Sequence, residues 1–263
     1  MPLIRLHIAY DGTNYHGWQI QPNARTVEGE LMRAVMRIIH TDEPIKVQGA
    51  SRTDAGVHAL GQVAHFRHES ARTVWDFVRG LNALTDDDLL VTRASEVDDS
   101  FHARHTARGK IYCYRIWNHR FVNPFDARTS WQVGPALDFD AMRAAAAHLI
   151  GTHDFSAFRA GDCASPTTVR CIQRIEIRAT GTLVEIEVEG TAFLKNMVRI
   201  IVGTLVDVAH ARQSAESVKR AVASGRRSDA GHTAPAAGLT LVKIHYPDHP
   251  WPQSEPSIGG SHG

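Results

Sequence analysis

The N-terminal segment reads IRLHIAYDG from Ile4 to Gly12. Its apolar residues stand at every second position at first, which is the period of a strand with one buried face. The Asp-Gly pair that follows is a combination that turns readily. From Val27 to Ile39 the apolar positions follow helical spacing, with Thr26 as the expected N-cap. The chain is therefore predicted to begin with a strand, a turn and a helix.

Similar elements recur along the rest of the chain. Short strands are predicted at 45–50, 62–66 and 89–94, with a polar loop at 51–61 and a helix at 73–84. The second half reads as a strand at 111–117, a helix at 138–150, a hairpin of strands at 170–178 and 182–189, further helices and a last strand at 239–246. This order predicts the α+β class: two α+β domains with mixed, largely antiparallel sheets that join around a central cleft.

The length and composition agree with a folded protein of two domains. The chain has 263 residues, of which 43% are hydrophobic and 22% charged, and this excludes a wholly disordered, collagen-like or coiled-coil chain. We expect an N-terminal domain at 1–104, a C-terminal domain at 105–246 and a flexible tail at 247–263, because the tail is rich in Pro, Gly and Ser.

The sequence also indicates where the protein works. No apolar run approaches the roughly 18 residues of a membrane span, and no signal peptide is visible. The three cysteines form no C-x-x-C pair, which argues against a disulfide framework or a thiolate zinc site. We therefore expect a cytoplasmic protein without a membrane partner.

The formal net charge of +1 conceals an uneven distribution. Acids crowd residues 86–99, and basic residues then dominate 104–128 and again 195–227. One interpretation is a basic face that binds a polyanion. The alternative is that these runs are ordinary solvated faces.

Common catalytic motifs are missing, but one loop carries candidate chemistry. No phosphate-binding Gly-rich pattern, serine-hydrolase elbow or H-E-x-x-H occurs, and the histidines near Asp54 match no metal-ligand spacing, so we expect neither a cofactor nor a metal. The stretch SRTDAGVHA, from Ser51 to Ala59, places an acid beside a guanidinium in a loop between strands, where catalytic groups often lie. The alternative for Asp54 is that it braces the turn.

Six segments together carry a resemblance to a known family. In chain order they are AYDGTNYHGWQIQ (9–21), SRTDAGVHALGQVAHF (51–66), KIYCYRIWN (110–118), GTHDFSAFR (151–159), FLKNMVRIIVGTL (193–205) and APAAGLTL (234–241). They resemble the tRNA pseudouridine synthase A family over nearly the whole chain. One departure is Ser51, which stands where a glycine is frequent in the family. The tail matches nothing in the family.

The resemblance implies a fold, a reaction and a partner. The fold is the pseudouridine synthase fold, and the reaction is isomerisation of uridine to pseudouridine in the anticodon stem-loop of tRNA, at positions 38, 39 and 40. The glycosidic bond is cleaved, the base turns, and C5 is joined to the sugar. No cofactor, metal or energy donor takes part, in agreement with the missing motifs. A homodimer is implied, in which one subunit modifies the stem-loop while the other holds the tRNA body.

The resemblance also implies site residues. Asp54 matches the catalytic aspartate, acting as a nucleophile on the sugar or the base, or as a base on the sugar C2′ hydrogen. Arg199 matches an active-site arginine that can donate charge-assisted hydrogen bonds, and Tyr112 a tyrosine that can stack on uracil and approach C5. From position alone, Arg199 reads as a surface arginine and Tyr112 as packing.

Three further residues are predicted to bind RNA. Arg52 is the candidate to fill the place of the flipped base or to contact a phosphate. Arg108 and Lys110, in the first basic run, are the candidate phosphate contacts. The competing interpretation is a noncatalytic RNA-binding protein with two α+β domains, whose tyrosines stack bases. A metal-dependent hydrolase is a third. An RNA-binding sheet explains neither the R-T-D-A-G-V-H loop nor the distant Arg199.

Overall fold

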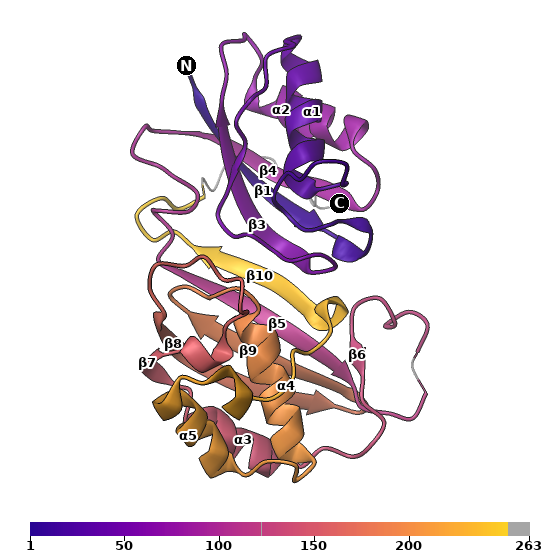
Figure 1. Ribbon diagram of the computed structural model, residues 1–263. Coiled ribbons are helices and arrows are strands. Elements are labelled where there is room, and N and C mark those ends of the chain that lie inside the picture. The colour runs from indigo at the N-terminus through magenta and orange to yellow at the C-terminus, as the bar shows by residue number, and fades with distance from the viewer. Residues whose placement is uncertain (122, 252–263) are drawn as a thin grey trace. The chain divides into compact units, whose positions relative to one another are not determined.

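The computed structural model describes residues 1–121 and 123–251 and separates the chain into two compact units (Figure 1). Unit 1 contains Met1–Arg108 and the C-terminal stretch from Leu241, and unit 2 contains Gly109–Thr240. The N-terminal segment and the described C-terminal stretch, 241–251, therefore belong to the same unit.

Unit 1 is an antiparallel sheet with two helices. Strand β1 (Leu3–Tyr10) lies between β4 (Leu89–Val97) and β3 (His58–Arg67), and the short β2 (Gln48–Gly49) pairs with β3. Helices α1 (Val27–Ile39) and α2 (Val74–Leu84) contact each other, and α2 packs on β4. The last strand, β10 (Leu239–His245), crosses into unit 1 at Leu241, where Gly61 of β3 lies so close to the Val242 carbonyl that a Cβ would stand 2.2 Å from its oxygen.

Both helices of unit 1 follow from sequence pattern. The apolar face of α1 places Leu31 and Val35 in the core, both fully buried. Helix α2 begins with a capping box, in which Thr73 and Asp76 each accept the other's backbone N–H.

Unit 2 is likewise a largely antiparallel sheet covered by helices. Its strands run in the order β5 (Gly109–Trp117), β9 (Leu183–Gly190), β8 (Val169–Thr180) and β7 (Gly151–Asp154), all antiparallel, and β6 (Trp131–Gln132) pairs in parallel with β5. The helices are α3 (Phe139–Ala147), α4 (Met197–Ala209) and α5 (Ala215–Ser224). Short 3-10 turns occur at Gly12–Asn14, Ser156–Phe158, Arg227–Asp229 and Ala236–Gly238.

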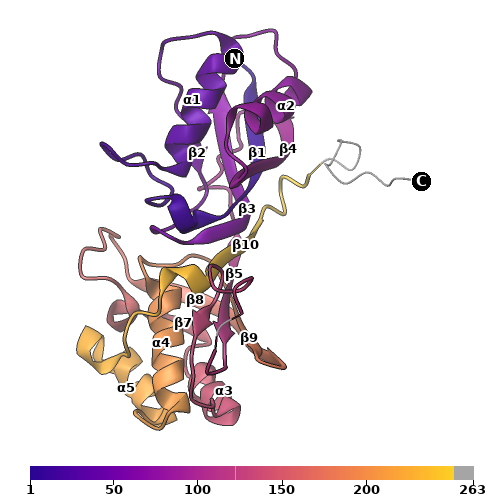
Figure 2. The ribbon, with the colours of Figure 1, turned by 90° about the vertical axis from the view of Figure 1, so that its right-hand side faces the viewer.

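Helix α4 is the centre of unit 2. Nearly all its residues are buried, because α3 packs against it on one side and β5 on another (Figure 2). Gly203 lets the chain at His232 cross the helix closely, since a Cβ there would stand 1.9 Å from the His232 carbonyl oxygen. The helix is thus a rigid support for any side chain at its first turn.

The α+β class with largely antiparallel sheets, predicted from the sequence, is confirmed. Some boundaries were predicted wrongly. Strand β3 begins at His58, inside the predicted loop, because the chain there pairs with the end of β1, with Tyr10 opposite Ala59. Strand β2 spans only Gln48–Gly49, and the short β6 and β7 were not predicted, because two to four residues show no clear period.

The first residues of the predicted tail contact β1. The Arg5 guanidinium, 1% exposed, donates to the carbonyls of His249 at 2.8 Å and Pro250 at 3.3 Å and lies 3.7 Å from the centroid of the Trp251 ring. The rest of the predicted tail, 252–263, lies outside the described residues.

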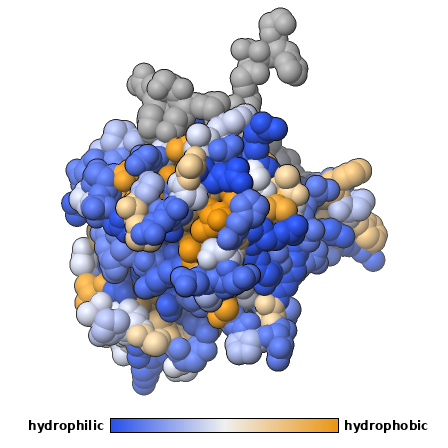
Figure 3. Space-filling view, turned by 90° about the horizontal axis from the view of Figure 1, so that it is seen from above, coloured by the Kyte–Doolittle hydropathy of each residue, from blue (hydrophilic) through white to orange (hydrophobic). Residues whose placement is uncertain are grey.

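Among the described helices, none combines the length and apolar character required to cross a membrane. Seen from above, the surface is mostly hydrophilic with hydrophobic residues in small groups (Figure 3).

Candidate active site

The loop that carries Asp54 alternates between buried and exposed side chains. Ser51 and Thr53 are 8% and 6% exposed, Arg52 between them is exposed, and Asp54 is half-buried. The carbonyl of Asp54 accepts a hydrogen bond from the Val57 N–H at 3.1 Å, and this closes a turn. Gly56 in that turn has φ 76°, a conformation that favours glycine. The sequence therefore presents the carboxylate on a short, well-defined turn.

The segment that follows β1, residues 15–18, packs against the backbone of this loop. The Trp18 N–H donates to the Thr53 carbonyl at 3.0 Å, and the Gly56 N–H donates to the Tyr15 carbonyl at 3.2 Å. Gly17, with φ 92°, lies so close that a Cβ would stand 2.6 Å from the Thr53 carbonyl oxygen. Segments 9–21 and 51–66, both of which resemble the family, are thus joined by backbone hydrogen bonds within unit 1.

His58 fixes the far end of the loop. Its Nδ1 lies 3.1 Å from both the Gly12 N–H nitrogen and the Asp11 carboxylate. The ring is 4% exposed, so its position is set by the packing of unit 1. The loop is consequently held at Thr53, Gly56 and His58.

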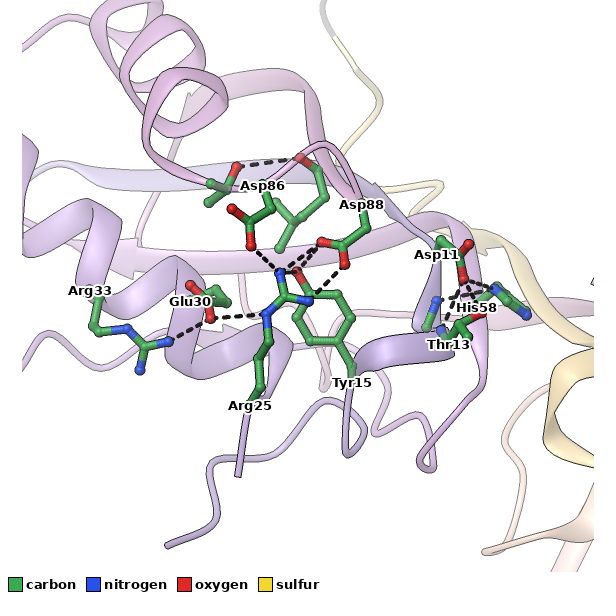
Figure 4. A network of polar contacts seen from close by, with 12 residues as sticks. Asp11, Thr13, Tyr15, Arg25, Glu30, Arg33, His58, Asp86 and Asp88 are labelled. Carbon is green, nitrogen blue, oxygen red and sulfur yellow. Dashed lines mark hydrogen bonds and ion pairs between the residues drawn. The ribbon is translucent and has the colours of Figure 1, made fainter. Parts of the chain in front are cut away.

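A polar network anchors the supporting segment to the rest of unit 1 (Figure 4). The Arg25 guanidinium donates to both oxygens of Asp88, at 2.7 and 2.9 Å, and stacks 4.2 Å from the centroid of the Tyr15 ring, while the Tyr15 hydroxyl donates to Asp88 at 2.8 Å. The hydrogen bond from Arg25 lowers the pKa of Asp88, and burial together with the Asp88 carboxylate raises the pKa of Tyr15. Asp88 is therefore ionised and Tyr15 neutral at neutral pH.

Two tyrosines of β5 face the core of unit 2. Tyr112 is 6% exposed and lies edge-on to the Phe193 ring, with 5.2 Å between centroids. Tyr114 is fully buried, and its hydroxyl donates to the Pro235 carbonyl at 2.7 Å. Burial raises the pKa of Tyr114. Tyr114 is thus a core residue of unit 2, whereas Tyr112 contacts Phe193 in the segment that precedes α4.

Arg199 lies in the first turns of α4 and is oriented by its own unit. Its Nε donates to the Ala234 carbonyl at 2.8 Å and its Nη1 to the side-chain oxygen of Asn196 at 3.0 Å. The Ala234 N–H in turn donates to the Arg199 carbonyl at 3.1 Å. Asn196, the N-cap of α4, has φ 62°, which is unusual for a residue other than glycine. The guanidinium is therefore held in a defined plane.

The predicted site residues divide between the units. Asp54, Arg52 and Arg108 belong to unit 1, and Lys110, Tyr112 and Arg199 belong to unit 2. Arg108 is exposed and pairs with Asp248 at 3.1 Å, and Lys110 lies at the start of β5 opposite Gly190. Within the described ranges, no cluster of His, Cys, Asp and Glu has the arrangement of a metal site.

Sequence reasoning assigned no site role to three side chains that contact candidate site residues or their loop: Tyr10 contacts Thr53, Gln62 contacts Ser51, and Asn196 contacts Arg199. Tyr10 was predicted only as a strand residue, and Gln62 and Asn196 were given no role of their own. A signal was available for Gln62, because a polar side chain between Gly61 and the apolar run Val63–Ala64 is unusual in a buried strand. For Asn196 no local pattern distinguishes a support from a surface amide.

Comparison with known proteins defines the class. A family model described as tRNA pseudouridine synthase matches residues 7–105 and 145–247. Proteins named tRNA pseudouridine synthase A are similar along nearly their whole length: one from Acetivibrio thermocellus is 44% identical over 92% of this chain and 99% of its own. Those of Myxococcus xanthus and Geotalea uraniireducens are 45% and 44% identical, covering 95% and 94% of this chain and 94% and 100% of theirs.

Among solved structures, a chain of a Cbf5-Nop10-Gar1 complex aligns with TM-score 0.34 and 10% identity over 90% of this chain and 57% of that one, too distant a likeness for any argument. The family match and the relatives place the protein in the class of RNA-modifying isomerases. The chain belongs to the tRNA pseudouridine synthase family.

Proposed function

We propose that this protein converts uridine to pseudouridine in the anticodon stem-loop of tRNA, at positions 38, 39 and 40. The observation that carries the proposal is the Asp54 loop. Its R-T-D-A-G-V-H sequence lies inside the family match, and its half-buried carboxylate stands on a turn held by backbone hydrogen bonds. Binding without catalysis would not require such a carboxylate.

The reaction is an isomerisation, so no atom is gained or lost. The N1–C1′ bond breaks, the uracil turns, a C5–C1′ bond forms, and the proton that leaves C5 is balanced by one gained at N1. In our proposal Asp54 is the group that acts on the sugar or the base. Its place beside the buried Thr53 supports this role, because a carboxylate on a rigid support needs little reorganisation during the reaction.

Unit 2 supplies the remaining candidate groups in this proposal. Tyr112 stacks on the uracil and its hydroxyl assists proton removal at C5. Arg199 donates charge-assisted hydrogen bonds, and the fixed plane of its guanidinium supports that role. Arg52, exposed two residues before Asp54, fills the place of the flipped base or contacts a phosphate. Arg108 and Lys110 contact phosphates.

The decisive experiment is pseudouridine mapping of unmodified tRNA after incubation with the purified protein. We expect pseudouridine within the anticodon stem-loop for the wild type and none for Asp54→Asn, which should still bind tRNA and keep the wild-type Tm. Asp99→Asn is the control, since this exposed acid of unit 1 pairs with Arg67 and lies outside the Asp54 loop. Wild-type turnover by Asp54→Asn would show that Asp54 only braces its turn.

The same assay separates the competing function. If the wild-type protein binds tRNA but forms no pseudouridine, it is a noncatalytic RNA-binding protein. We further propose that the protein is a cytoplasmic homodimer, in which one subunit modifies the stem-loop and the other holds the tRNA body. Light scattering at micromolar concentration tests this, and a monomer that remains active would contradict it.

A further inference from the structure

Gln62 is a fully buried amide that pairs with the backbone of the catalytic loop. Its Oε1 accepts from the Ser51 N–H at 3.2 Å, and its Nε2 donates to the Ser51 carbonyl at 2.7 Å. The two contacts fix the orientation of the amide, because the backbone N–H needs an acceptor and the carbonyl a donor. The Gln62 amide therefore satisfies both backbone groups of Ser51, as the backbone of a neighbouring strand does in a sheet.

Tyr10 extends this contact to the next buried residue of the loop. The Gln62 Nε2 also lies 3.5 Å from the Tyr10 hydroxyl, and that hydroxyl lies 2.8 Å from the Thr53 Oγ1. The register of β1 on β3 shifts between Ile8 and Tyr10, and irregularities of this kind re-aim side chains. Tyr10 is 5% exposed, so water does not compete for its hydroxyl.

Both contacts fall on residues that alternate with the functional ones. Because buried and exposed side chains alternate along 51–54, contacts that fix Ser51 and Thr53 also set where the side chains that follow each of them, Arg52 and Asp54, leave the core. The burial pattern agrees, since the first two are buried and the other two are exposed or half-buried.

We propose that Gln62 and Tyr10 are positioning residues, whose buried side chains fix Ser51 and Thr53 and so hold the Asp54 carboxylate in its reactive orientation. This inference rests on the proposed function, in which Asp54 is the catalytic carboxylate. Positioning matters for rate more than for binding, because a shift of about 1 Å in a reacting group can cost on the order of 100-fold in turnover.

The test compares Tyr10→Phe, Thr53→Val and Gln62→Met in kcat, KM for tRNA and Tm. Tyr10→Phe removes only the hydroxyl and should lower kcat about 10-fold with KM changed less than about twofold. Gln62→Met removes both hydrogen bonds to the Ser51 backbone and should lower kcat about 100-fold. Should Gln62→Met fail to fold, Tyr10→Phe and Thr53→Val still decide the matter.

Tyr246→Phe is the matched control. Tyr246 is another buried tyrosine of unit 1, and its hydroxyl donates to the carbonyl of Ala103, outside the loop. We expect it to lower Tm as Tyr10→Phe does but to keep the wild-type kcat. Equal kcat for Tyr10→Phe and Tyr246→Phe would overturn the inference, because Tyr10 would then contribute stability alone.

A double variant shows whether the hydroxyl pair acts as a unit. If it does, Tyr10→Phe with Thr53→Val should lose no more kcat than either single variant. Losses that multiply would contradict the proposed contact. Wild type and Asp54→Asn accompany every assay: an inactive wild type overturns the proposed function, whereas an active wild type with a fully active Tyr10→Phe overturns only the positioning role.

Discussion

Asn196 holds an uncommon backbone conformation next to the guanidinium it binds. A left-handed φ costs an ordinary residue of the order of 1 kcal/mol, and residues that retain it are concentrated at functional sites. Asparagine tolerates this conformation better than most residues and also offers an acceptor to Arg199. Asn196 therefore contributes in two ways: its backbone adopts the left-handed conformation at the start of α4, and its side-chain amide accepts from Arg199.

Substitutions at Asn196 separate these two properties. Asn196→Gly keeps the backbone at no strain but removes the acceptor, and we expect about a 10-fold loss of kcat with Tm nearly unchanged. Asn196→Ala adds strain and should lower Tm as well, while Asn196→Asp keeps an acceptor and should retain most activity. Steady-state kinetics and thermal melts measure both. Wild-type kcat for Asn196→Gly would show that Arg199 needs no support from this amide.

At the scale of single residues, the sequence indicated which side chains are candidates for the chemistry but not which residues hold them in place. Asp54, Tyr112 and Arg199 were selected from motifs, and their roles stay predictions. Their supports depend on distant pairs: Ser51 and Gln62 are 11 residues apart, and Arg199 and Ala234 are 35 apart. Hydrogen bonds of this kind follow from the folded path of the chain, which no local pattern encodes.

At the scale of elements, the period of the apolar residues predicted the long strands and helices well. Helix α1 occupies Val27–Ile39 as expected, because its buried face repeats at helical spacing. Strand β3 was placed too late because its first residues, His58 to Gly61, show no apolar alternation. Their strand conformation comes from pairing with β1, a tertiary effect.

His65 of β3 makes the stability of unit 1 dependent on pH. Burial, followed by the neighbouring His102 and Arg67, lowers its pKa from 6.5 to about 4. Between these values the unfolded chain binds a proton that the folded chain does not, so the free energy of unfolding falls as pH decreases from 6.5 to about 4. The slope for one such group is at most about 1.4 kcal/mol per pH unit.

We expect His65→Gln to flatten this dependence, since glutamine does not titrate and can still accept from the Ala103 N–H, which lies 3.2 Å from His65 Nδ1. Melting curves from pH 7.5 to 4.5 compare the two proteins. Wild type should lose Tm more steeply on acidification, with the two curves closest at neutral pH. Parallel curves would mean that His65 titrates alike in both states.

At the scale of the whole molecule, tRNA binding should depend on salt. Phosphate contacts release counterions, so the affinity should fall linearly on a plot of log K against log salt concentration. Arg108→Ala or Lys110→Ala should each reduce that slope by about 1 and leave the modified uridines unchanged. Filter binding from 50 to 300 mM salt measures the slope. Arg143→Ala, outside both basic runs, is the control, and an equal effect of this variant would remove the assignment.

The division into units has a consequence for how the chain is made. Unit 1 combines a segment that precedes unit 2 in the chain with one that follows it, because β10 from Leu241 onward and the His249 and Pro250 carbonyls that accept from Arg5 come after Thr240. During synthesis, the edge of β3 that pairs with β10 therefore stays unpaired until all of unit 2 has been translated. The Arg5 guanidinium likewise lacks the His249 and Pro250 carbonyls until then. A nascent chain interrupted before Leu241 carries an incomplete sheet in unit 1. We therefore expect chaperones and proteases to act on the unit that contains Asp54 when translation stops early.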